Sequence, residues 1–275
     1  MNALRRHYPE YLMEAAGLGL FMILAAMFTT LFEHPGSPIY QSISDPLFRR
    51  FLIGIAMGLT AISIIYSPWG KQSGAHLNPA VTLTFFRLGK INPNDAVWYI
   101  LAQFSGGLLG ISIAAKILGT AIADPAVHYI VTMPGSNGAI MAFCAEVVIA
   151  FGMMTMVLNV SNNSKLARFT GLFAGILIAT YITIEAPLSG MSMNPARTLA
   201  SAIAAQNWTA IWIYFTAPLL GMLSAAEVYV RFKGLQAVHC AKLHHQNDRR
   251  CIFRCGYRDR SLQDRGDVLS DRFIP

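Results

Sequence analysis

The chain has 275 residues, of which 54% are hydrophobic and only 13% are charged. Soluble domains carry about 25% charged residues, so the composition excludes an ordinary water-soluble globule, which needs charged side chains on its surface. The charge is also unevenly distributed, because residues 233–275 hold 14 of the 35 charged residues. A net charge of +7 suggests nucleic acid in a soluble protein. In so apolar a chain, basic residues instead act as orientation signals beside membrane spans, and we expect no nucleic-acid partner but a lipid bilayer.

Six apolar stretches are each long enough to cross a bilayer, which takes about 20 residues. In chain order they cover residues 11–32, 51–69, 96–118, 139–160, 169–186 and 208–230. Glycines four residues apart in three of them, starting at Gly54, Gly106 and Gly171, favour close helix packing. Two further apolar stretches, 76–86 and 193–205, are too short to cross. We therefore expect an all-α membrane protein with six transmembrane helices and two re-entrant half-helices.

An internal duplication relates the two halves of the chain. Each short stretch follows the second span of a three-span half and opens with the same tripeptide: Asn78, Pro79 and Ala80 in the first half, Asn194, Pro195 and Ala196 in the second. A glutamate also lies in the first span of each half, Glu14 and Glu146. Because three spans is an odd number, the second half (about 131–232) must be inverted relative to the first (about 11–130). Inverted repeats with broken helices indicate a site near the bilayer midplane.

The tripeptide Asn-Pro-Ala suits the start of a helix that ends inside a membrane. Asn is a strong N-cap residue, Pro fits the first helical position, and the small Ala lets two helix ends approach. Two such ends entering from opposite faces bring their positive dipole ends together at the centre. This arrangement leaves the asparagine amides to donate to a passing oxygen and repels cations.

Basic residues fix the expected orientation. If the N-terminus lies in the cytoplasm, most of the 21 Lys and Arg residues fall on the cytoplasmic side, as the positive-inside rule requires. We therefore expect a cytoplasmic N-terminus (1–10), a channel domain (11–232) and a basic cytoplasmic tail (233–275). The expected location is the cell membrane, either a plasma membrane or an inner membrane.

The stretches Ser-Gly-Ala-His-Leu-Asn-Pro-Ala-Val-Thr (73–82) and Met-Asn-Pro-Ala-Arg (193–197) resemble the major intrinsic protein family, the aquaporins and aquaglyceroporins. The resemblance covers about residues 8–232. It implies inverted three-helix repeats that form a right-handed bundle around one pore per subunit, usually in a homotetramer. It further implies a passive channel for water and small neutral solutes that excludes protons and ions.

The resemblance also assigns pore residues by matching position. Asn78 and Asn194 match the paired asparagines of the central constriction. The outer selectivity filter falls on four positions: Met57, Ile182, Met191 and Arg197. One extra residue between the second span and the first motif leaves Gly58 as the alternative to Met57.

The expected filter of Met, Ile, Met and Arg lacks the aromatic and His side chains that narrow strict water pores in the family. A hydrophobic wall facing one cation suits a solute with a hydroxyl edge and a carbon backbone, so we expect glycerol or a similar solute to pass together with water. Thr198 stands where glycerol facilitators usually have Asp. A strictly water-selective aquaporin therefore stays open as the alternative.

Three further polar residues are expected in the membrane region. Glu14 and Glu146 match buried glutamates of the family, and their duplicated placement favours a structural role as acceptors of backbone N–H groups. Their alternative role is proton coupling in a secondary transporter, a different class of protein that also has inverted repeats. His76 is expected either to line the pore near its cytoplasmic mouth or to pack the loop.

The tail carries a weak candidate metal site. Cys240, His244, Cys251 and Cys255 have spacings found in structural zinc sites. We favour a largely disordered basic tail on anionic lipid, and expect no metal and no cofactor. The spans hold no nucleophile–base set, phosphate loop or metal pair, so we expect no enzyme. A scaffold without transport is disfavoured because Asn78, Asn194 and Arg197 are all present.

Overall fold

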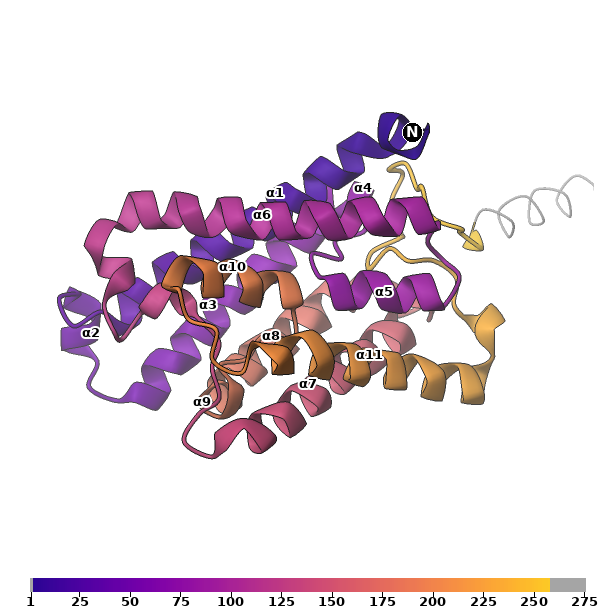
Figure 1. Ribbon diagram of the computed structural model, residues 1–275. Coiled ribbons are helices and arrows are strands. Elements are labelled where there is room, and N and C mark those ends of the chain that lie inside the picture. Colours follow the sequence, from indigo (N-terminus) through magenta and orange to yellow (C-terminus); the bar gives the residue numbers. More distant parts are fainter. Residues whose placement is uncertain (1, 258–275) are drawn as a thin grey trace, which may run out of the picture.

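The computed structural model describes residues 2–257, and every regular element within that range is helical. Six helices are long and apolar enough to cross a membrane: α1 (Asn2–Glu33), α3 (Pro46–Tyr66), α6 (Pro93–Leu118), α7 (Gly138–Ser161), α8 (Thr170–Ile184) and α11 (Ile211–Lys233). They correspond to the six expected spans (Figure 1). The expected fold class is therefore confirmed.

Two half-helices lie inside the bundle, α5 (Pro79–Arg87) and α10 (Pro195–Ala205) (Figure 1). Asn78 and Asn194 cap them, and a proline occupies the first turn of each, as it does in α3 and α6. The remaining elements are short: α2 (Pro38–Ser42), α4 (Pro68–Ser73), α9 (Ala186–Ser189), η1 (Gly119–Ala123), η2 (His128–Ile130), η3 (Ala167–Phe169) and η4 (Leu235–Ala237).

The helix pairing repeats in the two halves. Helix α1 packs along α6 in the first half, α7 packs along α11 in the second, and α3 packs along α8 to join them. Glycine permits close contact in all three pairs; in α3, for example, a Cβ on Gly58 would come within 2.5 Å of the Gly175 carbonyl oxygen of α8. Each half-helix contacts both α6 and α11, so the two helix starts are held inside the bundle.

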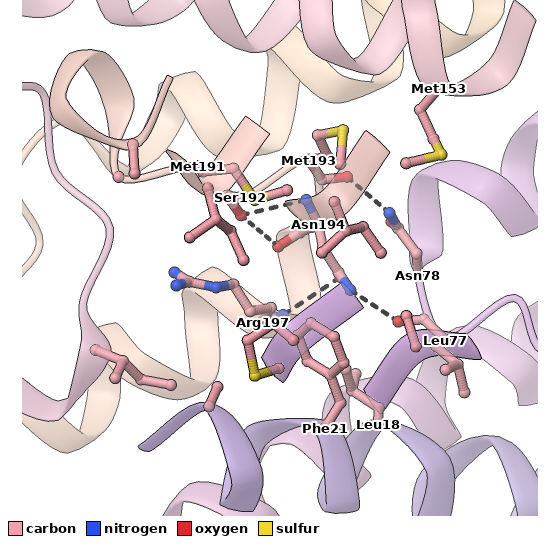
Figure 2. A pocket seen from close by; sticks show the side chains of 18 of the residues that line it. Leu18, Phe21, Leu77, Asn78, Met153, Met191, Ser192, Met193, Asn194 and Arg197 are labelled. Atoms are coloured by element: carbon pink, nitrogen blue, oxygen red, sulfur yellow. Dashed lines mark hydrogen bonds between the residues drawn. The ribbon is translucent and has the colours of Figure 1, made fainter. Parts of the chain in front are cut away.

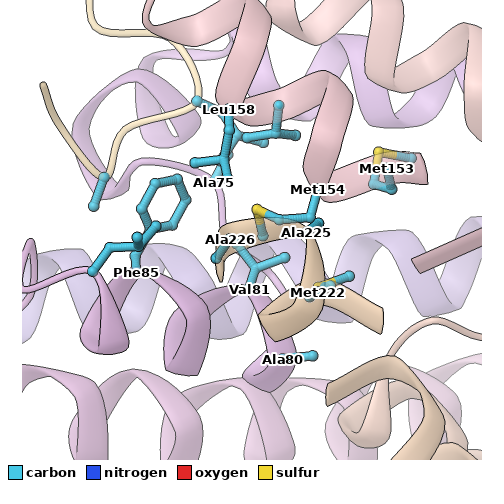
Figure 3. Close-up of a cluster of buried hydrophobic side chains, with 14 of the residues drawn as sticks. Ala75, Ala80, Val81, Phe85, Met153, Met154, Leu158, Met222, Ala225 and Ala226 are labelled. Carbon is cyan, nitrogen blue, oxygen red and sulfur yellow. The ribbon is translucent and has the colours of Figure 1, made fainter. Parts of the chain in front are cut away.

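The outer faces of the spans are apolar. Leu59, Leu109, Val148 and Ile184 have exposed fractions of 58%, 62%, 67% and 70%. Exposed apolar side chains on this scale are unusual on a soluble monomer but suit contact with lipid. One interior core cluster lies around α5, where Val81 and Phe85 pack with Met154, Leu158, Met222 and Ala226 from α7 and α11 (Figure 3).

The start of α1 and residues 234–257 lie at the same end of the bundle, which we call the tail end (Figure 1). We expected disorder from residue 233 onward, but the structure packs residues 234–257 against the bundle. The expectation is wrong for this segment because its apolar side chains, among them Val238, Leu243 and Phe253, are buried in the same core cluster as Phe85. Residues 258–275 of the expected tail lie outside the described residues.

Candidate functional site

The two asparagines meet in the middle of the bundle and bond crosswise (Figure 2). Asn78 Nδ2 donates to the Met193 carbonyl at 2.7 Å, and Asn194 Nδ2 donates to the Leu77 carbonyl at 2.7 Å. Each Oδ1 accepts a backbone N–H of the helix that its residue caps. An amide nitrogen carries two protons, so one N–H of each asparagine remains for another acceptor.

Buried glutamates hold the loops that carry these carbonyl groups. Glu14 accepts the backbone N–H of His76 at 3.0 Å and of Leu77 at 2.6 Å. Glu146 accepts the equivalent N–H groups of Ser192 and Met193, both at 2.7 Å. Side-chain donors add to both carboxylates: Ser73 and Gln103 for the first, Ser189 for the second. Both glutamates are fully buried, and each binds the backbone of one re-entrant loop.

Sequence reasoning missed the backbone geometry of these loops. Leu77 and Met193 have positive φ angles of 50° and 52°, and so do Ala75 and Met191, at 54° and 48°. Positive φ is uncommon for such residues. Ala, Leu and Met side chains do not favour positive φ, so no local sequence signal could have predicted the position of the two acceptor carbonyls.

A cavity of about 510 Å³ passes this crossing point. Met57, Ile182, Met191 and Arg197, the four expected filter residues, all line it. Met57 faces the cavity, whereas Gly58 packs against Gly175 of α8. Asn78, Asn194 and His76 line the cavity as well, but Glu14 and Glu146 do not.

Arg197 is the one positive side chain near the crossing point in Figure 2, and its guanidinium lies on the side of Asn194 away from Asn78. Within the described chain its Nη1 is buried and has no hydrogen-bond partner. The next residue, Thr198, is 1% exposed and bonds to Ser192 and Thr132 rather than lining the cavity. Arg197 thus brings an unused donor to the part of the cavity wall that Met57, Ile182 and Met191 make apolar, and Thr198 stabilises the loop behind it.

The tail segment reaches the cavity from the tail end. His76 Nε2 lies 2.8 Å from the Ala241 carbonyl oxygen, and the His76 ring stacks on Phe253 with centroids 5.4 Å apart. The Leu243 N–H donates to the Gly74 carbonyl at 3.1 Å, and the Leu243 side chain lines the cavity. The structure therefore gives His76 both expected positions, on the cavity wall and in a packed loop.

The tail cysteines come together, but with a different histidine from the one expected. Cys240, His245, Cys251 and Cys255 present ligand atoms that all lie within 4.8 Å of one another. His244 instead packs edge-on against Tyr66 of α3, with centroids 5.0 Å apart. The expected set is thus corrected from His244 to His245, because the His244 imidazole packs on Tyr66 while His245 lies among the thiols.

Hydrogen bonds within this cluster shift the pKa values of its ionisable side chains. Hydrogen bonds from the Cys240 and Cys251 thiols, and a further one with His245, lower the pKa of Cys255. Burial alone would lower the pKa of His245, but its hydrogen bonds with Cys251 and Cys255 raise it to about 9.

Comparison with known proteins agrees with this architecture. A family model described as Major intrinsic protein matches residues 8–229. The chain belongs to the major intrinsic protein family. Aquaporin NIP2-3 of Zea mays is 34% identical over 251 residues, 91% of this chain and 79% of that protein. Aquaporin NIP6-1 of Arabidopsis thaliana is 38% identical over 185 residues, 66% of this chain and 58% of that protein.

A probable aquaporin NIP-type of Nicotiana alata is 32% identical over 192 residues, 70% of this chain and 67% of that protein. The X-ray structure of the aquaglyceroporin from Plasmodium falciparum superposes with a TM-score of 0.67 at 22% identity, over 81% of this chain and 95% of that chain. That likeness establishes the fold. Membership makes this a multi-pass membrane channel for water and small solutes and not an enzyme.

Proposed function

We propose that this channel passes water together with glycerol or a similar small uncharged solute, and excludes protons and ions. The observation that carries the proposal is the composition of the filter. Met57, Ile182 and Met191 give the cavity an apolar wall, and Arg197 brings a donor with an unused N–H. A polyol has both a carbon edge and a hydroxyl edge, and such a filter matches both.

Exclusion of cations follows from three positive features that face the cavity, because the one carboxylate among its described lining residues, Glu33, is paired with Arg49. The starts of α5 and α10 meet at the crossing asparagines, so two positive helix ends are directed at the centre. Arg197 adds a full positive charge between that point and the end of the cavity opposite the tail end. A cation would have to pass all three, whereas a neutral solute would exchange one hydrogen-bond donor for the next.

The alternative of a proton-coupled transporter is disfavoured by the surroundings of Glu14 and Glu146. Four donors bond to Glu14 and three to Glu146, and neither carboxylate lines the cavity. A proton carrier has to exchange with the transport path. These two carboxylates are engaged in holding loops.

The proposed setting is the cell membrane, with the tail end in the cytoplasm, because basic residues favour that side. Both Arg5 and Arg6 of α1 and the basic segment 242–254 lie at this end. We also propose a homotetramer, as the family resemblance implies. The broad apolar outer faces of the spans would serve lipid and neighbouring subunits equally well.

The test is stopped-flow permeability of proteoliposomes to water, glycerol and urea. Each is measured for the unmodified chain and for Lys242→Met. Lys242 Nζ donates to the carbonyl oxygens of Arg249 and Arg250, so its loss should loosen the tail segment that reaches the cavity. Ile182→His should introduce the narrowing polar side chain of strict water pores, and glycerol permeability should fall about tenfold or more while water still passes. Ile182→Leu is the matched control and should conduct like the unmodified chain.

Three results would count against the proposal. Rapid water flux with no glycerol flux in the unmodified filter would favour the strictly water-selective alternative. Vesicles that match empty liposomes for every solute, with and without Lys242→Met, would refute the channel itself. An ion current comparable to the water flux would refute the exclusion of cations.

A further inference from the structure

We propose that Cys240, His245, Cys251 and Cys255 bind one Zn²⁺ ion, and that this ion fixes residues 240–255 as a plug over the tail end of the pore. The metal site stands independently of transport, whereas the plug rests on the proposed channel function. The ligand set is three thiols and one imidazole, a combination that structural zinc sites use.

The geometry of the cluster fits a tetrahedral ion. Four ligands at about 2.3 Å from a tetrahedral centre lie roughly 3.8 Å from one another. Cys240 Sγ and Cys251 Sγ are 3.6 Å apart, and all four ligand atoms lie within 4.8 Å of one another. Cys255 Sγ and His245 Nε2 form a hydrogen bond of 2.9 Å, which coordination would replace with a slightly wider separation. Soft thiolate ligands select zinc over magnesium or calcium.

The surroundings support a closed structural site. Cys240 and Cys251 are buried, with exposed fractions of 2% and 7%. The His245 ring stacks on Tyr257, with centroids 4.5 Å apart and planes inclined by 21°, which fixes the orientation of the imidazole.

A buried cation accompanies the three thiols. Lys242, two residues after Cys240, is only 2% exposed. Its Nζ donates to the carbonyl oxygens of Arg249 and Arg250, at 3.1 and 2.7 Å. Three thiolates and one Zn²⁺ leave a net charge of −1, which a nearby ammonium compensates. Lys242 also closes the loop that joins the two halves of the ligand set.

The residues that contact the pore alternate along the chain with the ligands. Between Cys240 and His245, the Ala241 carbonyl meets His76 and Leu243 caps the cavity. Between Cys251 and Cys255, the Phe253 ring stacks on His76. The Arg254 N–H also donates to the Lys90 carbonyl at 3.0 Å, just past the end of α5.

Ala241 and Leu243 lie between the first two ligands, and Phe253 lies between the last two. Fixing the four ligands therefore fixes the residues that contact the cavity wall. Loss of the ion would release the stretches 240–245 and 251–255, because the only regular element that lies wholly within the described segment 234–257 is the short η4. The pore would then open at the tail end.

The first experiment measures zinc in the purified full-length chain by mass spectrometry of the metal. We expect about one zinc per chain, and a Co²⁺-substituted protein with the visible absorption bands of tetrahedral thiolate coordination. Cys251→Ser/Cys255→Ser should lose the metal. Two matched controls, Cys144→Ser in α7 and His244→Asn next to the ligand, should keep it. A metal-free unmodified chain, or one in which the mass and thiol titration reveal a Cys240–Cys251 disulfide, would overturn the site.

The second experiment compares water permeability of proteoliposomes before and after removal of zinc with a membrane-permeant chelator. We expect permeability to rise several-fold on removal and to fall again when Zn²⁺ is restored. Cys251→Ser/Cys255→Ser should conduct at the higher level whether or not the chelator is present. Equal permeability with and without bound zinc, in a chain that conducts, would overturn the plug. A chain that binds zinc but conducts in no state would leave the site standing and refute the channel.

Discussion

Replacing Glu146 with Gln tests whether this carboxylate is a structural hub or a proton carrier. Glu146 accepts from Ser192 N and Met193 N at 2.7 Å and from Ser189 Oγ at 2.8 Å. A Gln side chain has one acceptor oxygen, and its amide NH₂ would point at a backbone N–H. The unpaired backbone N–H and the weaker bonds to a neutral acceptor cost a few kcal/mol of folding free energy. This cost is partly offset because the variant buries no charge. The net loss of stability is about 1–3 kcal/mol.

Thermal unfolding of the purified chain in detergent measures that loss. About 2–4 °C per kcal/mol for a chain of this size gives a fall in Tm of about 2–12 °C. Water permeability should fall too, because Met193 carries the acceptor of Asn78. The control is Glu227→Gln, whose ion pair with Arg87 is more than half exposed and is worth about 0–1 kcal/mol.

Two outcomes would refute this account of Glu146. One is an unchanged Tm in Glu146→Gln, which would mean that the three bonds contribute nothing to folding. The other is uphill solute accumulation driven by a pH gradient in the unmodified chain and abolished in the variant. That result would make the protein a coupled transporter rather than a passive channel.

Three further substitutions have expected outcomes. Gly58→Ala brings a methyl group within 2.5 Å of the Gly175 carbonyl, so α3 and α8 should separate and the yield of folded protein in size-exclusion chromatography should fall sharply. Asn194→Ala removes an N-cap worth about 0.5–2 kcal/mol and one crosswise bond, so both Tm and water permeability should fall; a normal value of each would contradict the assignment. Arg197→Val removes the filter cation, and the variant should admit larger neutral solutes in the vesicle assay; an unchanged solute cut-off would contradict its role there.

The six spans and two half-helices could be predicted from the sequence because hydrophobic length and the Asn-Pro-Ala starts are local signals. The orientation of Met57 rather than Gly58 toward the cavity could only be favoured, since it depends on which face of α3 packs against α8. Residues 234–257 are packed where we expected a disordered segment. Its apolar residues, such as Val238 and Phe253, are too few and too scattered to form a pattern, and their burial depends on the surface that the bundle presents.

The histidine of the cysteine cluster could not be chosen from spacing either. His244 and His245 are adjacent, so both satisfy the spacing of a metal site. The difference between them is set by Tyr66, a residue of α3 far away in the sequence, which engages His244. Contacts of this kind exist only after the chain has folded.

The crosswise bonds of the asparagines have a consequence for how the protein is made. The acceptor of Asn78 lies 115 residues further along the chain. At synthesis rates of about 5–20 residues per second, the first re-entrant loop waits roughly 6–23 s for its partner. The Glu14 bonds to this loop need only residues up to Gln103, so the first half can hold its own loop in shape during that interval. The central amide nonetheless stays unpaired in the membrane until the second half inserts, and a ribosomal pause between the halves would prolong that exposure.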